Sequence, residues 1–128
     1  MTSKVFFSKK AAFSSSISHL KKTIQQHMER KNAILPQIEA AQKQIRISSA
    51  QVESYKKLFA KGNISVAYLQ DAESKYAQSM GSEGALRAQL AETEHAIIQS
   101  EVAVENNQNE FFEKVIAELK ENQVQLSL

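Results

Sequence analysis

The side chains of this sequence best suited to bind a metal or to act as acid or base are three histidines and fourteen acidic residues, and its 128 residues include no cysteine. Two histidines four positions apart on a helix can begin a zinc site, and a third ligand must complete it. His19, His27 and His95 do not have this spacing. We therefore predict no metal site, and we interpret His27 as a polar residue of a helix interface and His95 as a solvent-exposed one.

Catalysis by carboxylates is not expected either. A carboxylate that acts as an acid or base usually lies in a concave pocket that excludes water, whereas Asp71, Glu73 and Glu92 fall within long helical segments. Nucleophile-elbow, phosphate-loop and dinucleotide-binding motifs are missing. The sequence therefore predicts a protein without catalytic residues or cofactors, which acts through its shape and surface.

The elements that carry these residues are predicted to be two long helices. Apolar residues recur every 3.5 positions from Phe13 to Phe59 and again from Leu69 to Phe111, which is typical of a helix packed along a narrow seam. If the chain folds back at Gly62, the numbers of facing seam residues sum to 124. The predicted pairs are Phe13 with Phe111, Leu20 with Val104, Ile34 with Leu90, Ile38 with Leu86, Val52 with Ala72 and Tyr55 with Leu69. The fold class is therefore all-α, a long antiparallel two-helix coiled-coil hairpin.

We expect a single domain in which residues 1–12 are frayed, 13–59 form the first arm, 60–65 the tip and 66–123 the second arm. Pro36 removes a backbone donor, so it should kink the first arm or divide it. Gly62 and Asn63 tolerate the left-handed conformation of a reversal, and Ser65 is a natural N-cap. Beyond residue 106 the apolar phase is expected to slip by one residue. The seam would then pass to Phe112, Val115 and Leu119.

Charge is divided unequally between the two halves. Residues 1–64 contain 12 basic and 3 acidic residues, a net charge of +9, and residues 65–128 contain 4 and 11, a net charge of −7. A basic arm can bind nucleic acid, but the acidic arm is the nearest partner, so we interpret the split as pairing specificity and predict no nucleic-acid binding.

Polar residues in the seam either fix its register or accommodate sideways packing against other copies. They are Lys31, Ser48, Ser79, Glu83, Ser100 and Asn107.

Residues 54–78, SYKKLFAKGNISVAYLQDAESKYAQ, resemble the hairpin tip of periplasmic adaptor subunits, the membrane fusion proteins of the HlyD family. Hairpins of that family reverse at a sequence close to L-x-x-x-G-x-I-S, followed by a short acidic and aromatic run. The matching residues here are Leu58, Gly62, Ile64, Ser65, Leu69, Asp71, Ala72 and Tyr76. The flanking helical sequences look like the ascending and descending helices of type I secretion adaptors.

The resemblance implies that the chain is the helical hairpin of a larger periplasmic adaptor, anchored in the inner membrane of a Gram-negative bacterium. No apolar run approaches the ~20 residues that span a bilayer, so the anchor is expected outside this sequence. Such adaptors bridge an inner-membrane ABC transporter, through parts absent here, to a TolC-type outer-membrane channel for type I protein or peptide secretion. They self-associate into a ring of hairpins. The resemblance assigns channel docking to Ser54, Lys57, Leu58, Lys61, Gly62, Asn63, Ile64 and Ser65.

Two alternative functions are open. One is the hairpin of a drug-efflux adaptor, whose branch of the family carries Arg at the position of Ser54. The serine at this position favours the secretion branch. In that branch Lys56, Lys57 or Lys61 supplies the positive charge. The other is a generic coiled-coil scaffold or interaction module. A scaffold would need the seam but not the tip sequence.

Overall fold

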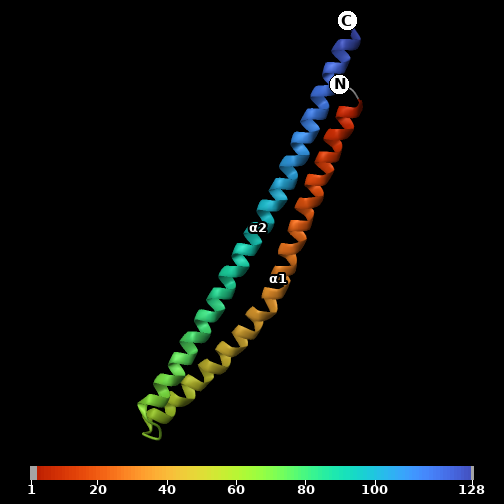
Figure 1. Cartoon of the computed structure of the whole chain (residues 1–128). Coiled ribbons are helices and arrows are strands. Elements are labelled where there is room, and N and C mark those ends of the chain that lie inside the picture. Colours follow the sequence, from red (N-terminus) through yellow and green to blue (C-terminus); the bar gives the residue numbers. More distant parts are fainter. Residues whose placement is uncertain (1–2, 128) are drawn as a thin grey trace. The chain divides into compact units, whose positions relative to one another are not determined.

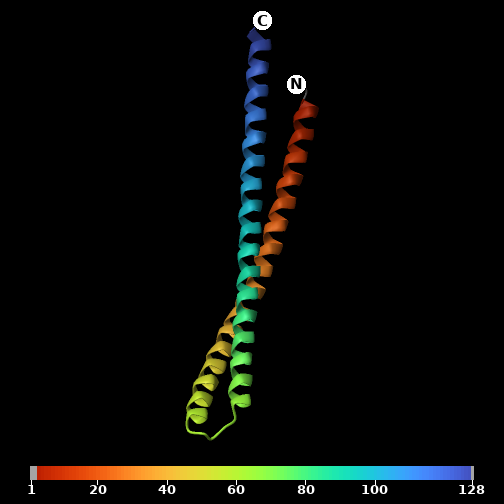
Figure 2. The same cartoon turned by 90° about the vertical axis from the view of Figure 1, so that its left-hand side faces the viewer.

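The computed structural model describes residues 3–127 as two helices, α1 (Ser3–Ala60) and α2 (Val66–Ser127). The helices run in opposite directions and are joined by a short turn, which confirms the all-α hairpin (Figure 1). The chain divides into two compact units. The tip unit is Arg30–Thr93 and includes the turn; the terminal unit contains the residues up to Glu29 and those from Glu94 onward (Figure 2).

The core of the tip unit is the predicted seam. Ile34, Ile38 and Val52 of α1 and Ala72 of α2 are buried, and each lies at a position of the 3.5-residue repeat. Burying an aliphatic side chain of this size stabilises a fold by roughly 1.5–3 kcal/mol, so these residues account for much of the attraction between the helices. The remaining predicted seam positions of this unit are buried or half-buried, except Phe59, which is exposed.

The terminal unit confirms the predicted register. The rings of Phe13 and Phe111 stack, with centroids 4.3 Å apart and planes 7° from parallel, as expected for a pair whose numbers sum to 124. Ile17 and Ile97 are buried in the same seam. The predicted seam positions of this unit, from Phe13 onward in α1 and up to Phe111 in α2, are all buried or half-buried.

The predicted slip of the seam toward Phe112 and Leu119 is wrong. These two side chains are 64% and 58% exposed, and of the three predicted positions only Val115 is half-buried. Glu118 occupies the position expected for Leu119. Its Oε1 accepts a 2.7 Å hydrogen bond from Lys9 Nζ of α1. An ion pair across the two helices therefore lies in the seam at this level, and the two apolar side chains are turned outward.

Both helices extend beyond their predicted limits. α1 already includes residues 3–12, which were expected to be frayed, and α2 continues to Ser127 rather than ending near residue 123. Met1 and Thr2 lie outside the described residues.

Pro36 does not divide the first arm, since α1 continues through it. The proline ring has no N–H to offer the carbonyl of Asn32, four residues earlier. Next to this point the side chain of Gln37 donates from Nε2 to the carbonyl of Ala33 at 3.1 Å. A side-chain amide thus supplies an additional hydrogen bond to the backbone where the proline weakens it.

Candidate functional site

The turn that joins the helices is closed by the last carbonyl groups of α1. The N–H of Asn63 donates to the carbonyl of Leu58, and the N–H of Gly62 donates to the carbonyl of Phe59, both at 2.9 Å. These two bonds form the Schellman motif, which needs a left-handed residue directly after the helix. Gly62 fills that position with a φ of 74°. The local sequence therefore fixes the direction in which the chain leaves α1.

The turn offers a direct test of this backbone requirement. A Cβ at Gly62 would meet no atom within 4 Å, so the Gly62→Ala variant should lose about 1–2 kcal/mol of stability from its left-handed φ alone. Gly81 is equally unobstructed but lies inside α2 with no unusual φ. Gly81→Ala should therefore gain roughly 0.5–1 kcal/mol. Urea unfolding followed by circular dichroism measures both, and shifts of the same sign would contradict the role of Gly62.

The eight residues predicted to dock lie together at the end of the tip unit. Ser54, Lys57 and Leu58 belong to the last two turns of α1, and the other five occupy or adjoin the turn. Seven of the eight are exposed, and Ile64 is half-buried. Ser65 directly precedes the first residue of α2, the position of an N-cap. The predicted docking residues therefore lie at the turn end of the tip unit, where their side chains are accessible.

Three further apolar side chains are exposed beside these residues, and sequence reasoning missed them as docking residues. They are Phe59, Val66 and Tyr68, the last with 63% of its surface exposed. Phe59 was assigned to the seam because it continues the repeat. The register could have revealed it, because its partner by number is Ser65, a small polar residue that cannot cover a phenyl ring. We call Leu58, Phe59, Val66 and Tyr68 the tip surface.

The charge around the tip surface is positive. Lys56, Lys57 and Lys61 lie here, and no acidic residue occurs between positions 54 and 70. Lys56 Nζ lies 3.7 Å from Glu53 of its own helix, and both side chains are exposed, so the pair contributes little. Lys57 and Lys61 form no ion pair within the described residues. The tip can therefore offer positive charge to a partner.

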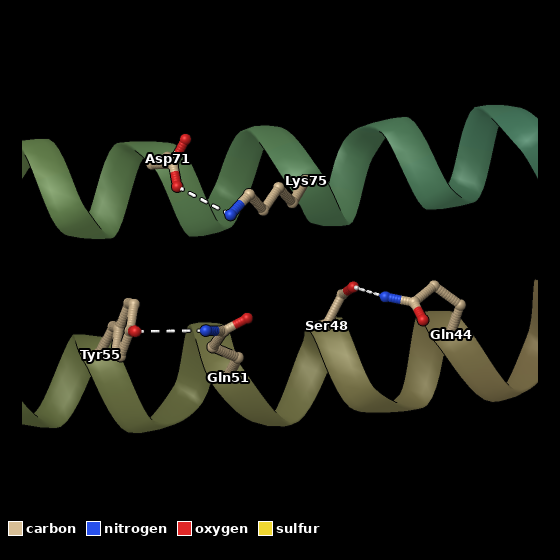
Figure 3. Close-up of polar contacts among 6 residues, drawn as sticks. All are labelled: Gln44, Ser48, Gln51, Tyr55, Asp71 and Lys75. Atoms are coloured by element: carbon tan, nitrogen blue, oxygen red, sulfur yellow. Dashed lines mark hydrogen bonds and ion pairs between the residues drawn. The ribbon is translucent and has the colours of Figure 1, made fainter.

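Most polar contacts above the tip run along each helix, and one crosses between the helices, joining Ser48 Oγ and Ser79 Oγ at 3.4 Å. In Figure 3, Asp71 pairs with Lys75 on α2 at 3.2 Å, and on α1 Gln44 and Gln51 contact the side chains of Ser48 and Tyr55 at 3.4 and 3.2 Å. A groove of about 300 Å³ lies beside Ser48. Amide, hydroxyl and methyl groups line it together with Lys75. Lys75 is paired with Asp71 of its own helix at the edge of this groove.

The polar seam residues obtain hydrogen bonds from their own helices. Ser79, Thr93 and Asn107 each donate to the carbonyl four residues earlier, at 2.9, 2.8 and 2.8 Å. Glu83 pairs with Arg87, one turn further along α2. A buried polar group costs little once it is hydrogen-bonded. These seam positions are therefore compatible with burial between two helices.

The histidines do not form a shared site. His27 is half-buried, with its Nδ1 atom buried and without a hydrogen-bond partner, and His95 is exposed. Within residues 3–127 no group of three or more His, Cys, Asp or Glu could hold a metal ion. Neither α1 nor α2, as far as each is described, contains a stretch apolar and long enough to cross a membrane.

A family model described as "AprE, long alpha-helical hairpin" matches residues 2–127. No curated protein matches the chain significantly. The matched family has the same architecture as the two helices described above, and the match covers the turn and both arms.

Proposed function

The chain belongs to the AprE family of long α-helical hairpins, and from this premise we propose that it docks a periplasmic secretion adaptor onto a TolC-type outer-membrane channel. AprE is a type I secretion adaptor of the HlyD family, so the resemblance noted in residues 54–78 is confirmed at the level of the family. The hairpin of such an adaptor is a structural module rather than a catalytic one.

In this proposal the hairpin lies in the periplasm and belongs to a larger protein anchored in the inner membrane. Other parts of that protein contact an ABC transporter, while the hairpin holds its tip against the channel. A protein or peptide then crosses both membranes in one step. Copies of the adaptor surround the path as a ring.

The observation that carries the docking proposal is the combination of apolar and basic side chains at the turn. Exposed apolar side chains that cluster on a soluble protein mark interaction sites, and the tip surface is such a cluster at the end of both helices. Lys56, Lys57 and Lys61 lie around this cluster, and no acidic residue occurs between positions 54 and 70. We therefore expect the channel to present apolar depressions bordered by carboxylates, because opposite charges accelerate and orient the encounter.

Cross-linking from the turn tests the docking proposal. Because the chain has no cysteine, the variant Ser65→Cys carries a single thiol to which a photoactivatable benzophenone can be attached. We expect illumination in the presence of a purified TolC-type channel to produce a covalent adduct with the channel. The matched control is Glu39→Cys, since Glu39 is exposed on α1 in the same unit but far along the helix from the turn. Equal labelling from both positions, or none from Ser65→Cys, would contradict docking through the tip.

A further inference from the structure

The seam of the tip unit contains a stretch with little apolar packing. Ile38 and Val52 of α1 are buried at the two ends of this stretch. Between them, three successive levels of the seam each include a polar side chain. By the register in which facing numbers sum to 124, the pairs at these levels are Ala41 with Glu83, Ile45 with Ser79 and Ser48 with Tyr76. Because the attraction between two helices grows with the apolar area that they bury, it is reduced over this stretch.

The hydrogen bond that crosses the same stretch is long. Ser48 Oγ and Ser79 Oγ lie 3.4 Å apart, beyond the usual range for a bond between hydroxyl groups. The groove of about 300 Å³ opens beside these two serines, with Ala41 and Ser82 in its lining. The helices are therefore held together less firmly here than at the levels of Ile38 and Val52.

The backbone of α2 is weakened along the same stretch. Gly81 and Gly84 lie inside the helix, with Ser79 and Ser82 next to them, and glycine inside a helix makes it less stable than alanine does. Ser79 Oγ also donates to the carbonyl of Lys75 at 2.9 Å, a contact that often bends helices. Sharp bends occur characteristically at prolines and at glycine and serine pairs. We call residues 79–84 the hinge segment.

Packing within the described residues does not explain the two glycines of the hinge segment. A Cβ at Gly81 or Gly84 would meet no atom within 4 Å, and both positions are exposed. Neither residue has the positive φ that Gly62 has. An alanine would therefore fit at both positions, so the glycines affect how easily α2 deforms rather than how it packs in this conformation.

α1 has a weak point of its own in the tip unit. Pro36 lies inside the helix and offers no N–H to the carbonyl of Asn32. By the register of the seam, Pro36 lies level with Ala88 of α2, about one turn beyond Gly84. A pair of helices bends only if both of them yield, and the tip unit has a weak point in each helix within a few turns.

We propose that the hinge segment of α2, together with Pro36 of α1, lets the turn end of the tip unit bend relative to the levels of Ile34 and Ile38. A hinge of this kind is a short stretch that absorbs a change of backbone direction while the packed parts on either side keep their structure. The proposal rests on the proposed function only for its purpose, which is to let the tip surface adjust its direction to a partner. It can be tested on the purified chain without a channel, so the two proposals fail separately.

Hydrogen–deuterium exchange read by mass spectrometry tests local opening of the hinge segment. We expect its amides, after correction for intrinsic rates, to exchange faster than those in the flanking turns of α2, because a weakly packed segment opens more often. The double variant Gly81→Ala and Gly84→Ala should slow this exchange by roughly tenfold. The matched control is Ser74→Ala, an exposed position of α2 outside the hinge segment, which should leave the exchange there unchanged.

Distances between two spin labels test bending itself. Ala67 and Ala88 are exposed on α2 on either side of the hinge segment, and the 21 residues between them span about 30 Å of straight helix. Because the chain has no cysteine, the variant with Ala67→Cys and Ala88→Cys is labelled at these positions alone. Electron paramagnetic resonance should give a broad distribution of distances, which the two glycine-to-alanine substitutions make narrower.

Three results would overturn the proposal. The first is a hinge segment that exchanges no faster than the flanking turns of α2. The second is exchange that the two glycine-to-alanine substitutions leave unchanged, or that Ser74→Ala slows equally. The third is a distance distribution that is equally narrow with and without the two glycines.

Discussion

Replacing Leu58 by aspartate is expected to abolish binding of the hairpin to a TolC-type channel. Leu58 is an exposed member of the tip surface, and its carbonyl anchors the turn by accepting the bond from Asn63. Loss of a buried leucine at the interface costs about 1.5–3 kcal/mol. A carboxylate placed against an acidic partner adds repulsion and desolvation, so the dissociation constant should rise by roughly 100-fold or more.

Binding of the purified chain to an immobilised channel measures this effect. The control for a new surface charge is Ile47→Asp, which alters an exposed apolar residue on the same helix outside the tip and should leave the affinity unchanged. Because an aspartate near a helix C-terminus destabilises the helix by about 0.3–1 kcal/mol, Tyr68→Ala provides a second variant that leaves the end of α1 intact. Unchanged affinity in both tip variants would argue strongly against the tip as the docking site.

Replacing Ile34 by aspartate is expected to have the largest effect on folding. Ile34 is only 4% exposed in the seam of the tip unit, so the substitution removes its packing and buries a charged group. We expect a loss of about 4 kcal/mol or more, which is a large part of the 5–15 kcal/mol that stabilises a typical domain. Urea unfolding monitored by the helical circular dichroism signal measures the loss.

The next residue provides the matched control for Ile34. Leu35 is 44% exposed, so Leu35→Asp places the same charge one position along the same helix but in contact with water. Its cost should stay below about 1 kcal/mol. Equal destabilisation by the two substitutions would show that the helix tolerates charge equally on both sides, and would contradict the assignment of the seam.

The seam could be predicted from the sequence because its period is a property of helix geometry and does not depend on the identity of single residues. The 3.5-residue repeat placed Ile34, Val52 and Ala72 correctly, and folding the chain at Gly62 gave the register of the Phe13–Phe111 pair. Polar residues did not disturb this assignment, because residues such as Thr93 bond to their own helix.

The predicted seam is wrong at positions that were placed in it only because their residues are apolar. Leu119 is predicted in the seam because it is apolar, yet Glu118 forms an ion pair with Lys9 across the helices, and such a pairing depends on two residues far apart in the sequence. Phe59 was assigned to the seam although the chain reverses before a partner can cover it. Periodicity therefore predicts the path of the helices, whereas the surface at their end depends on where the second helix begins.

The closed turn at Gly62 has a consequence for how the tip would recognise any partner. A flexible loop loses about 1–2 kcal/mol of conformational entropy for each residue that becomes ordered on binding. Here the backbone is already held by the bonds from Asn63 and Gly62 to α1, so little of this loss remains. The strength of recognition is then set by the side chains that the turn displays. A substitution among these exposed side chains can then alter recognition while the backbone of the turn keeps its hydrogen bonds.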